Sequence, residues 1–323
     1  KPLTDEERST MREWVARRGA GEPLQLICGT APFRHMVLEV APGVLIPRPE
    51  TEVLVSEVLA LFPVPKQISA HAFEDLSAVS GQGEGVEDSA SEIPVVEIGS
   101  INEEVSSEVS AGGIDSAPEQ SEAFALKDGA QSSQSQIDGV EQDDETIAAG
   151  SASEMDSDPK PEAIRVIDLC TGSGCIACAL ATEHPNMEVL AFDIAPEALA
   201  LAQRNVEAQG VADRVAVRES DLLSTVVADS DNKGSFDVIV SNPPYIPSQV
   251  VDTLTAEVND YEPRLALDGG TDGLDVFRRL LKLAPQALRA GGMFVCELFE
   301  TNVGIAAQLC HEQGGWARIE VRD

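Results

Sequence analysis

One short stretch of the sequence, Asn242-Pro243-Pro244-Tyr245, has residue types that could bind a planar amide or amine. It follows the mainly apolar run 236–241, and a buried strand ending there would place Asn242 at the carboxyl end of a sheet, where open α/β folds bind ligands. Because proline fixes φ and lacks a backbone N–H, the turn is stiff, and the Pro243 carbonyl and the Asn242 side chain can both face a ligand. For this stretch alone, an ordinary strand-ending turn is an equally weighted alternative.

The segment 168–174, with the sequence DLCTGSG, is a glycine-rich loop between a predicted strand and a predicted helix. Its glycines let the backbone turn sharply and approach a ligand closely. Asp193 ends the next strand, where its carboxylate could bind ribose hydroxyls or, alternatively, cap the following helix. Asp221-Leu222, after the third strand, suits the adenine side of the same pocket. These features indicate a nucleoside-bearing cofactor and leave both NAD and S-adenosylmethionine open.

Predicted strands and helices alternate at close spacing from residue 164 onward, which indicates an α/β fold with a parallel sheet covered on both faces. The expected strands are 164–169, 188–193, 214–217, 236–241, 293–298 and 316–321. The expected helices are 175–183, 196–209, 274–288 and one that runs through Cys310. Cys175 and Cys178 lie on the first of these helices, and we interpret them as small core residues rather than as a metal or redox pair.

The N-terminal part predicts smaller elements. Thr4 and Glu7 fit a capping box for a helix over 5–18. A strand within 29–40 is expected to turn at 41–43 and return through 44–46 as a β-hairpin. The stretch 47–52, with the sequence PRPETE, then begins a helix with acidic residues in its first turn.

Residues 66–160 differ from the rest of the chain in charge. They hold 22 acidic and 3 basic residues, a net charge of −19 out of −34 for all 323 residues, and they lack hydrophobic periodicity. We therefore predict a disordered acidic insert, and we expect the fold to resume as though it were absent. The apolar patch 93–98 is interpreted as a sticky spot in this loop, although it could also pair transiently or dock a partner.

Charge and cysteine usage exclude some classes of partner. No part of the chain has the basic stripe that binding to a phosphate backbone requires, so duplex nucleic acid is disfavoured. The sequence has neither a secretory signal nor an apolar run of about 18 residues, and its six cysteines lie mostly in apolar runs. We expect a monomer in a reducing compartment that does not contact a membrane.

Three motifs together resemble the release factor glutamine methyltransferases, the HemK-like (PrmC-type) branch of the class I methyltransferases. They are the Asn-Pro-Pro-Tyr stretch, the 168–174 loop and the sequence IPRPETE at 46–52. The segment 261–275, YEPRLALDGGTDGLD, also resembles that family. The resemblance implies a Rossmann-like class I methyltransferase sheet built from 49–65 and 161–323. Residues 1–48 would be the remnant of a substrate-recognition helical domain with a β-hairpin linker.

The resemblance also implies an activity. A methyl group would pass from S-adenosylmethionine to the side-chain amide nitrogen (N5) of the glutamine in the Gly-Gly-Gln loop of a peptide chain release factor. The product would be S-adenosylhomocysteine, and no metal would be needed. The implied catalytic residues are Asn242, Pro243 and Tyr245. The implied substrate-binding residues are Asn242, Pro243, Pro244 and Tyr245. The implied cofactor-binding residues are Cys170, Thr171, Gly172, Ser173, Gly174, Asp193, Asp221, Leu222 and Asn242.

Class I methyltransferases insert a seventh, antiparallel strand between the fifth and sixth strands, and the sequence offers no such segment after 316–321. We therefore predict an empty slot with two unpaired edges, which would destabilise the sheet. Two other functions stay open: methylation of exocyclic amino groups of nucleic acids, and a non-catalytic protein that recruits a basic partner through the acidic insert. For an enzyme, deleting 66–160 should leave methyl transfer intact. The motif 48–52 is closest to the bacterial-type branch, so we expect a mitochondrial location, with the cytoplasm as the alternative.

Overall fold

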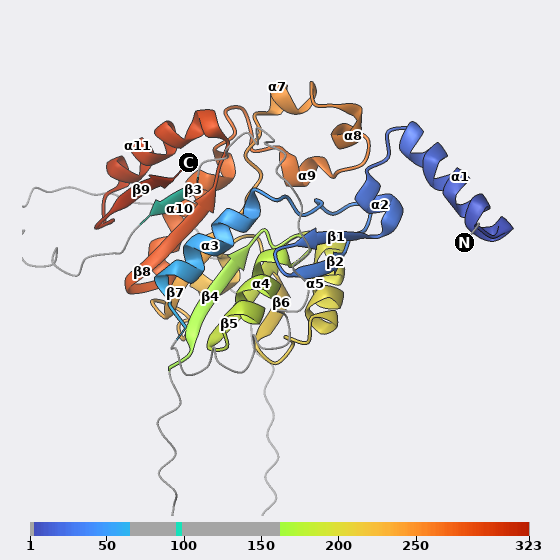
Figure 1. Cartoon of the computed structure of the whole chain (residues 1–323). Helices are drawn as coiled ribbons and strands as arrows, with labels where there is room; N and C mark the ends of the chain where they lie inside the picture. The colour runs from blue at the N-terminus through green and yellow to red at the C-terminus, as the bar shows by residue number, and fades with distance from the viewer. Residues whose placement is uncertain (1–2, 65–94, 99–161, 323) are drawn as a thin grey trace, which may run out of the picture. The chain divides into compact units, whose positions relative to one another are not determined.

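The computed structural model describes residues 3–64, 95–98 and 162–322, all of which belong to one compact unit. Its centre is a seven-stranded sheet with the order β6-β5-β4-β7-β8-β3-β9 (Figure 1). The strands are β3 (Val95–Ile98), β4 (Ile164–Leu169), β5 (Met187–Asp193), β6 (Val215–Glu219), β7 (Phe236–Ser241), β8 (Leu288–Glu297) and β9 (Ile319–Arg322). This confirms the predicted α/β sheet. Four of the six predicted strands from residue 164 onward are matched to within two residues at each end.

Parallel pairing brings the carboxyl ends of the central strands together. β4 lies between β5 and β7, with Asp168 opposite Ala191 on one side and Val240 on the other. The Ser241 hydroxyl donates to the carbonyl of Leu169 at 2.9 Å, which ties the ends of β7 and β4. The loops that follow these strands therefore begin at one edge of the sheet, as the sequence predicts.

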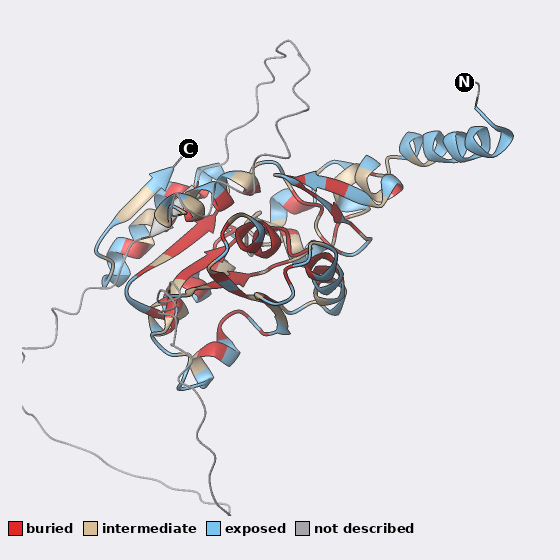
Figure 2. Cartoon of the chain, turned by 60° about the horizontal axis from the view of Figure 1, so that its bottom comes forward, coloured by how far each residue is buried: buried red, intermediate tan, exposed pale blue. Residues whose placement is uncertain are grey.

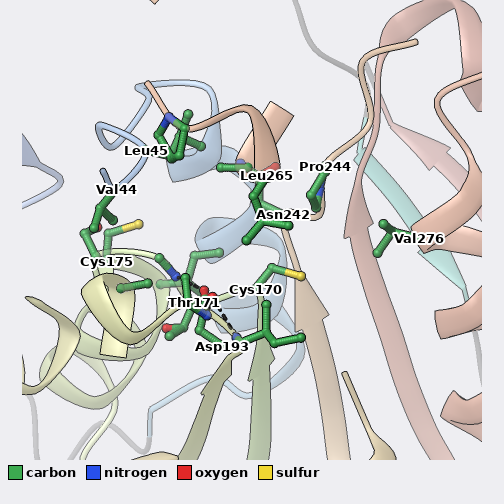
Figure 3. Close-up of a pocket in the computed structure, with 18 of the residues that line it drawn as sticks. Val44, Leu45, Cys170, Thr171, Cys175, Asp193, Asn242, Pro244, Leu265 and Val276 are labelled. Atoms are coloured by element: carbon green, nitrogen blue, oxygen red, sulfur yellow. Dashed lines mark hydrogen bonds between the residues drawn. The ribbon is translucent and has the colours of Figure 1, made fainter. Parts of the chain in front are cut away.

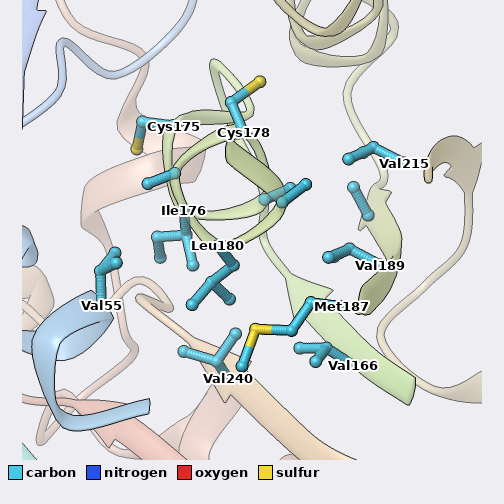
Figure 4. Packing of buried hydrophobic residues seen from close by; sticks show 14 of the residues in the cluster. Val55, Val166, Cys175, Ile176, Cys178, Leu180, Met187, Val189, Val215 and Val240 are labelled. Atoms are coloured by element: carbon cyan, nitrogen blue, oxygen red, sulfur yellow. The ribbon is translucent and has the colours of Figure 1, made fainter. Parts of the chain in front are cut away.

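Helices cover both faces of the sheet, and each face has its own apolar cluster (Figure 2). One face carries α3 (Thr51–Leu61), α4 (Cys175–Glu183) and α5 (Pro196–Ala208). The other carries α6 (Ser224–Ala228), α10 (Asp275–Ala287) and α11 (Val303–Gln313). Figure 4 shows α4 end-on, with Ile176 and Leu180 directed at Val55 of α3 and Val240 of β7. Cys178 is fully buried and Cys175 is 8% exposed, so their interpretation as core residues is confirmed.

The strand β3 corrects the prediction of an empty slot. β3 pairs antiparallel with β8 on one side and with β9 on the other, in the position where the seventh strand was expected to be missing. It comes from the apolar patch 93–98, so the interpretation of that patch as a sticky spot is wrong. The other residues of the predicted acidic insert lie outside the described residues. The domain boundaries at 48, 65 and 160 stay predictions.

The N-terminal elements agree with the sequence in part. Helix α1 (Asp5–Gly19) begins with the predicted capping box, in which Thr4 and Glu7 bond reciprocally. The predicted hairpin is misplaced: β1 (Thr30–Phe33) pairs with β2 (Met36–Glu39), so the chain turns at Arg34 rather than at 41–43. Arg34 has a φ of 50°, which side chains rarely adopt. Its guanidinium donates to Glu183 and to Ser56, and its backbone N–H donates to Glu52, which together hold this turn.

Several short helices were not predicted. They are α2 (Leu24–Cys28), α6 (Ser224–Ala228), α7 (Ser248–Val251), α8 (Ala256–Asn259) and α9 (Arg264–Leu267), with a 3-10 helix at Glu300–Asn302. Helices of four or five residues are too short for a hydrophobic period to show in the sequence. Within the described ranges, no helix has both the length and the apolar character to cross a membrane.

Candidate functional site

The glycine-rich loop between β4 and α4 is held from below by a buried carboxylate. Asp168 Oδ2 accepts hydrogen bonds from the Thr171 hydroxyl at 2.6 Å and from the Ala177 backbone N–H at 3.2 Å. Burial raises the pKa of Asp168 to about 7, and the bond from Thr171 opposes that shift. Gly174 has a φ of 79°, and a Cβ on it would lie 3.2 Å from Ala202 of α5. This glycine therefore allows α4 and α5 to approach closely.

Asp193 connects the end of β5 to the same loop. Its Oδ2 accepts the backbone N–H of Gly172 at 2.9 Å, and its Oδ1 accepts those of Ile194 and Ala195 at 2.8 and 3.0 Å (Figure 3). These bonds hold the turn after β5, but they do not cap α5, whose N-cap is Ala195 and has no side-chain cap bond, so the alternative of capping is wrong. Asp193 also lines the cavity described below, and its binding of ribose hydroxyls stays a prediction.

The Asn-Pro-Pro-Tyr turn is fixed by contacts from two distant segments. The Asn242 amide Nδ2 donates to the Thr51 hydroxyl at 2.9 Å, and Thr51 is the first residue of α3. On the other side, a Cβ on Gly269 would lie 2.8 Å from the Pro244 carbonyl oxygen. A Cβ on Gly273 would lie 2.3 Å from the carbonyl oxygen of Tyr245. The segment 261–275 therefore packs so closely on the turn that only glycine fits at these two positions.

A buried ion pair joins the motif 46–52 to the segment 261–275, which lie on either side of the Asn-Pro-Pro-Tyr turn. Arg48 donates to Glu262 at 2.6 Å, and the Glu262 side chain is 2% exposed. Burial raises the pKa of Glu262, while Arg48 acts in the opposite direction. Breaking such a pair would leave a buried carboxylate without its cation, which is why we assign Arg48 and Glu262 a structural role beside the site.

A cavity of about 230 Å³ lies at the carboxyl ends of β4, β5 and β7, between the glycine-rich loop and the Asn-Pro-Pro-Tyr turn (Figure 3). Most predicted site residues line it: Cys170, Thr171, Gly172, Ser173, Asp193, Asp221, Leu222, Asn242 and Pro244. Three predicted residues lie outside the lining. Gly174 and Pro243 are buried, and the Tyr245 hydroxyl donates to Glu297 at 3.1 Å instead of facing the cavity.

The cavity also has walls that the sequence did not single out. The apolar and small residues among them are Gly43, Val44, Leu45, Ile46, Pro47, Cys175, Ile176, Ile194, Ala195, Ala198, Pro263, Leu265, Ala266 and Val276. Ile194 is 50% exposed although it directly follows the buried strand β5, so the cavity offers an apolar side chain to a ligand. Thr51 also lines the cavity and was not predicted. Nothing in the motif 47–52 distinguishes it, because its contact with Asn242 joins residues that are distant in the sequence.

Comparison with known proteins agrees with this geometry. Residues 145–260 match the model of the methyltransferase small domain, and residues 1–29 match that of the PrmC N-terminal domain. A release factor glutamine methyltransferase of Geobacter sulfurreducens is 32% identical over 298 residues, which are 92% of this chain and 68% of that protein. Its counterpart in Streptomyces coelicolor is 31% identical, over 94% of this chain and 73% of its own.

A ribosomal protein uL3 glutamine methyltransferase of Bradyrhizobium diazoefficiens is 45% identical over 134 residues, but these are only 42% of this chain and 40% of that protein. The relatives that match nearly the whole chain are therefore the ones that decide the assignment. The chain belongs to the release factor glutamine methyltransferase family, a branch of the class I S-adenosylmethionine-dependent methyltransferases.

Proposed function

We propose that this protein transfers a methyl group from S-adenosylmethionine to the side-chain amide nitrogen of a glutamine in a peptide chain release factor. The observation that carries the proposal is the orientation of Asn242 at the cavity. Because its Nδ2 donates to Thr51, its Oδ1 is left to accept a hydrogen bond from a substrate. An acceptor of this kind is what an amide N–H of glutamine requires.

The residues of the cavity fit S-adenosylmethionine. Asp193 supplies a carboxylate for ribose hydroxyls, and Ile194 and Leu222 supply apolar surface for the adenine. Asp221, which pairs with Arg279 at 2.7 Å, lies on the adenine side. A Cβ on Gly172 would meet no atom of the described residues nearer than 3.9 Å, so the space beside this glycine is open to a ligand. The methionine portion can therefore lie directly against the backbone of the glycine-rich loop. When bound, S-adenosylmethionine supplies an activated methyl group on a sulfonium sulfur.

The protein's own contribution is to position the glutamine and to stabilise it as it reacts. An amide nitrogen is a poor nucleophile, because its lone pair is delocalised into the carbonyl. Asn242 Oδ1 can accept one of its N–H groups, and this hydrogen bond strengthens as positive charge develops on the nitrogen. The stiff turn at Pro243 and Pro244 holds that acceptor in place, which reduces the entropy lost on reaching the reactive geometry.

Asp193→Asn is expected to raise the Kd for S-adenosylmethionine about 10- to 100-fold, because a hydrogen bond to a carboxylate is stronger than one to an amide. Asparagine keeps only one of the two oxygens that accept the backbone N–H groups of Gly172, Ile194 and Ala195, so circular dichroism of the variant checks that its fold is retained. Isothermal titration calorimetry measures the effect. Asp213→Asn is the matched control, since the side chain of Asp213 is 72% exposed and outside the cavity lining. Equal Kd values for the two variants would contradict the role of Asp193.

The function itself is tested by offering three acceptors with radiolabelled S-adenosylmethionine. The acceptors are a release factor, ribosomal protein uL3 and single-stranded or duplex nucleic acid. We expect label in the release factor, because the net charge of −34 opposes binding to nucleic acid and full-length similarity favours the release factor. Label in nucleic acid alone, or in uL3 alone, would contradict the proposed substrate. The mitochondrial location stays a prediction from the sequence.

A further inference from the structure

A buried carboxyl group that the proposed function does not use lies behind the Asn-Pro-Pro-Tyr turn. Glu297, the last residue of β8, is 1% exposed. Its Oε1 accepts the hydrogen bond from the Tyr245 hydroxyl at 3.1 Å, and its Oε2 has no partner with full hydrogen-bond geometry among the described residues. A buried carboxyl oxygen without a hydrogen-bond donor costs folding free energy, which indicates that Glu297 has a function in the site.

Thr51 connects this carboxyl group to Asn242. The Thr51 side chain is 3% exposed, and its hydroxyl oxygen accepts the hydrogen bond from Asn242 Nδ2 at 2.9 Å. Since that oxygen accepts from Asn242, its own proton is directed elsewhere. Polar interactions of Glu297 with Thr51 and with Asn242 favour its ionised form. Because Glu297 Oε2 is buried without a hydrogen-bond donor in the described part of the chain, it is the acceptor that the proposal below assigns to the Thr51 proton.

We propose, building on the proposed function, that Glu297 and Thr51 are positioning residues that fix the amide orientation of Asn242, so that its Oδ1 rather than its Nδ2 faces the glutamine amide. A flipped Asn242 would direct Oδ1 at the Thr51 oxygen, and it would need the Thr51 proton that Glu297 already binds. We call the hydrogen-bonded chain from Glu297 through Thr51 to Asn242 the relay. Its three residues come from β8, α3 and the loop after β7, so it forms only in the assembled sheet.

The relay works only while Glu297 is ionised. Burial raises the pKa of Glu297 to about 7, the bonds from Thr51, Tyr245 and Asn242 lower it, and the charge of Glu50 raises it. Arg48 is the nearby cation, acting on the pKa of Tyr245. A protonated Glu297 keeps only one acceptor oxygen and gains a hydroxyl donor, so it can no longer accept from both Tyr245 and Thr51 in the same way. Activity should therefore fall as the pH drops below about 7.

The first test is a pair of substitutions at Thr51, with kcat measured on a release factor at saturating S-adenosylmethionine. Thr51→Val keeps the shape but removes the hydroxyl, and it should lower kcat about 10- to 100-fold. Thr51→Ser keeps the hydroxyl but loses a buried methyl group, and its kcat should stay within about threefold of the parent. If Thr51 only fills space, the order reverses or the two variants behave alike, and that result would overturn the relay.

The second test follows kcat against pH for the parent and for Glu297→Gln. Glutamine, like a protonated carboxyl group, has one acceptor oxygen and a donor, but it does not titrate. The kcat of the variant should therefore be low at every pH, near the low-pH value of the parent, and should show no further loss below about pH 7. Asp168, whose pKa is also about 7, is present in both proteins, so only the difference between their pH profiles reports Glu297. An unchanged loss of kcat at low pH in Glu297→Gln would refute the proposal.

A third readout does not depend on activity. The folded-state pKa of Glu297 lies above the ordinary value of 4.5, so the parent loses stability as the pH rises from about 4.5 through about 7. Glu297→Gln lacks this loss, and its Tm should exceed that of the parent more at pH 8 than at pH 5. A gain independent of pH would show that Glu297 does not titrate there and would count against the relay. A parent that methylates no glutamine would instead refute the proposed function, and this unfolding measurement would still judge the relay.

Discussion

Replacing Asn242 with alanine is expected to lower kcat for methyl transfer to a release factor by about 10²- to 10³-fold, the usual cost of losing one preorganised hydrogen-bonding group at a reacting centre. Asn242 Oδ1 is the acceptor left free by the bond from Nδ2 to Thr51. The cofactor is expected to bind nearly as well as before, because Asp193 and the glycine-rich loop remain. Single-turnover kinetics and calorimetry measure the two quantities separately.

Asn186→Ala provides the matched control for this prediction. Asn186 stands just before β5, at the amino end of the sheet and outside the cavity lining. Its kcat should equal that of the parent. If Asn242→Ala turned over as fast as Asn186→Ala, the assignment of Asn242 as the acceptor would be wrong.

Deleting residues 66–160 is expected to destabilise the protein strongly, in contrast to the expectation from the sequence alone. The deletion removes β3, which lies between β8 and β9 in the sheet and pairs with both. Each lost ladder hydrogen bond costs about 1 kcal/mol, so several together should lower Tm by roughly 10 °C. Thermal unfolding followed by circular dichroism measures the change, and methyl transfer should fall with it.

A shorter deletion, of residues 102–158, is the matched control because it keeps β3. Ile98 pairs with Phe294 of β8, and β4 lies two strands beyond β8, so the chain must cross three strand spacings of about 4.8 Å each. The eight residues that remain between Ile98 and Ile164, at about 3.3 Å each, can span this distance. We expect the Tm of this variant to match the parent. Equal Tm values for both deletions would show that β3 contributes nothing to the sheet.

Much of the fold follows from local patterns in the sequence. The strands β4 and β7 are short, mainly apolar runs, and the helices α4, α5 and α10 have clear boundaries, so their positions agree closely with the structure. The hairpin was misplaced because the turn at Arg34 has no glycine, whereas Gly43 gives a strong turn signal nearby. The Arg34 turn depends on Glu52 and Glu183, which are distant in the sequence.

The central correction, β3, could not come from local patterns. Val95–Ile98 is a four-residue segment in an acidic background. It forms a strand because it can pair with β8 on one side and β9 on the other, which no local pattern shows. The site shows the same limit. The residues that line the cavity could mostly be predicted, because the ends of parallel strands converge. Thr51 and Glu297 could not, since they act through contacts with Asn242 and Tyr245 that exist only in the folded chain.

The most direct test of the account is peptide mass spectrometry of a release factor after incubation with this protein and S-adenosylmethionine. We expect one added methyl group, located on the glutamine of the Gly-Gly-Gln loop, and its absence when Asn242→Ala replaces the parent. A methyl group on any other residue, or an unmodified release factor beside a folded parent protein that binds the cofactor, would contradict it.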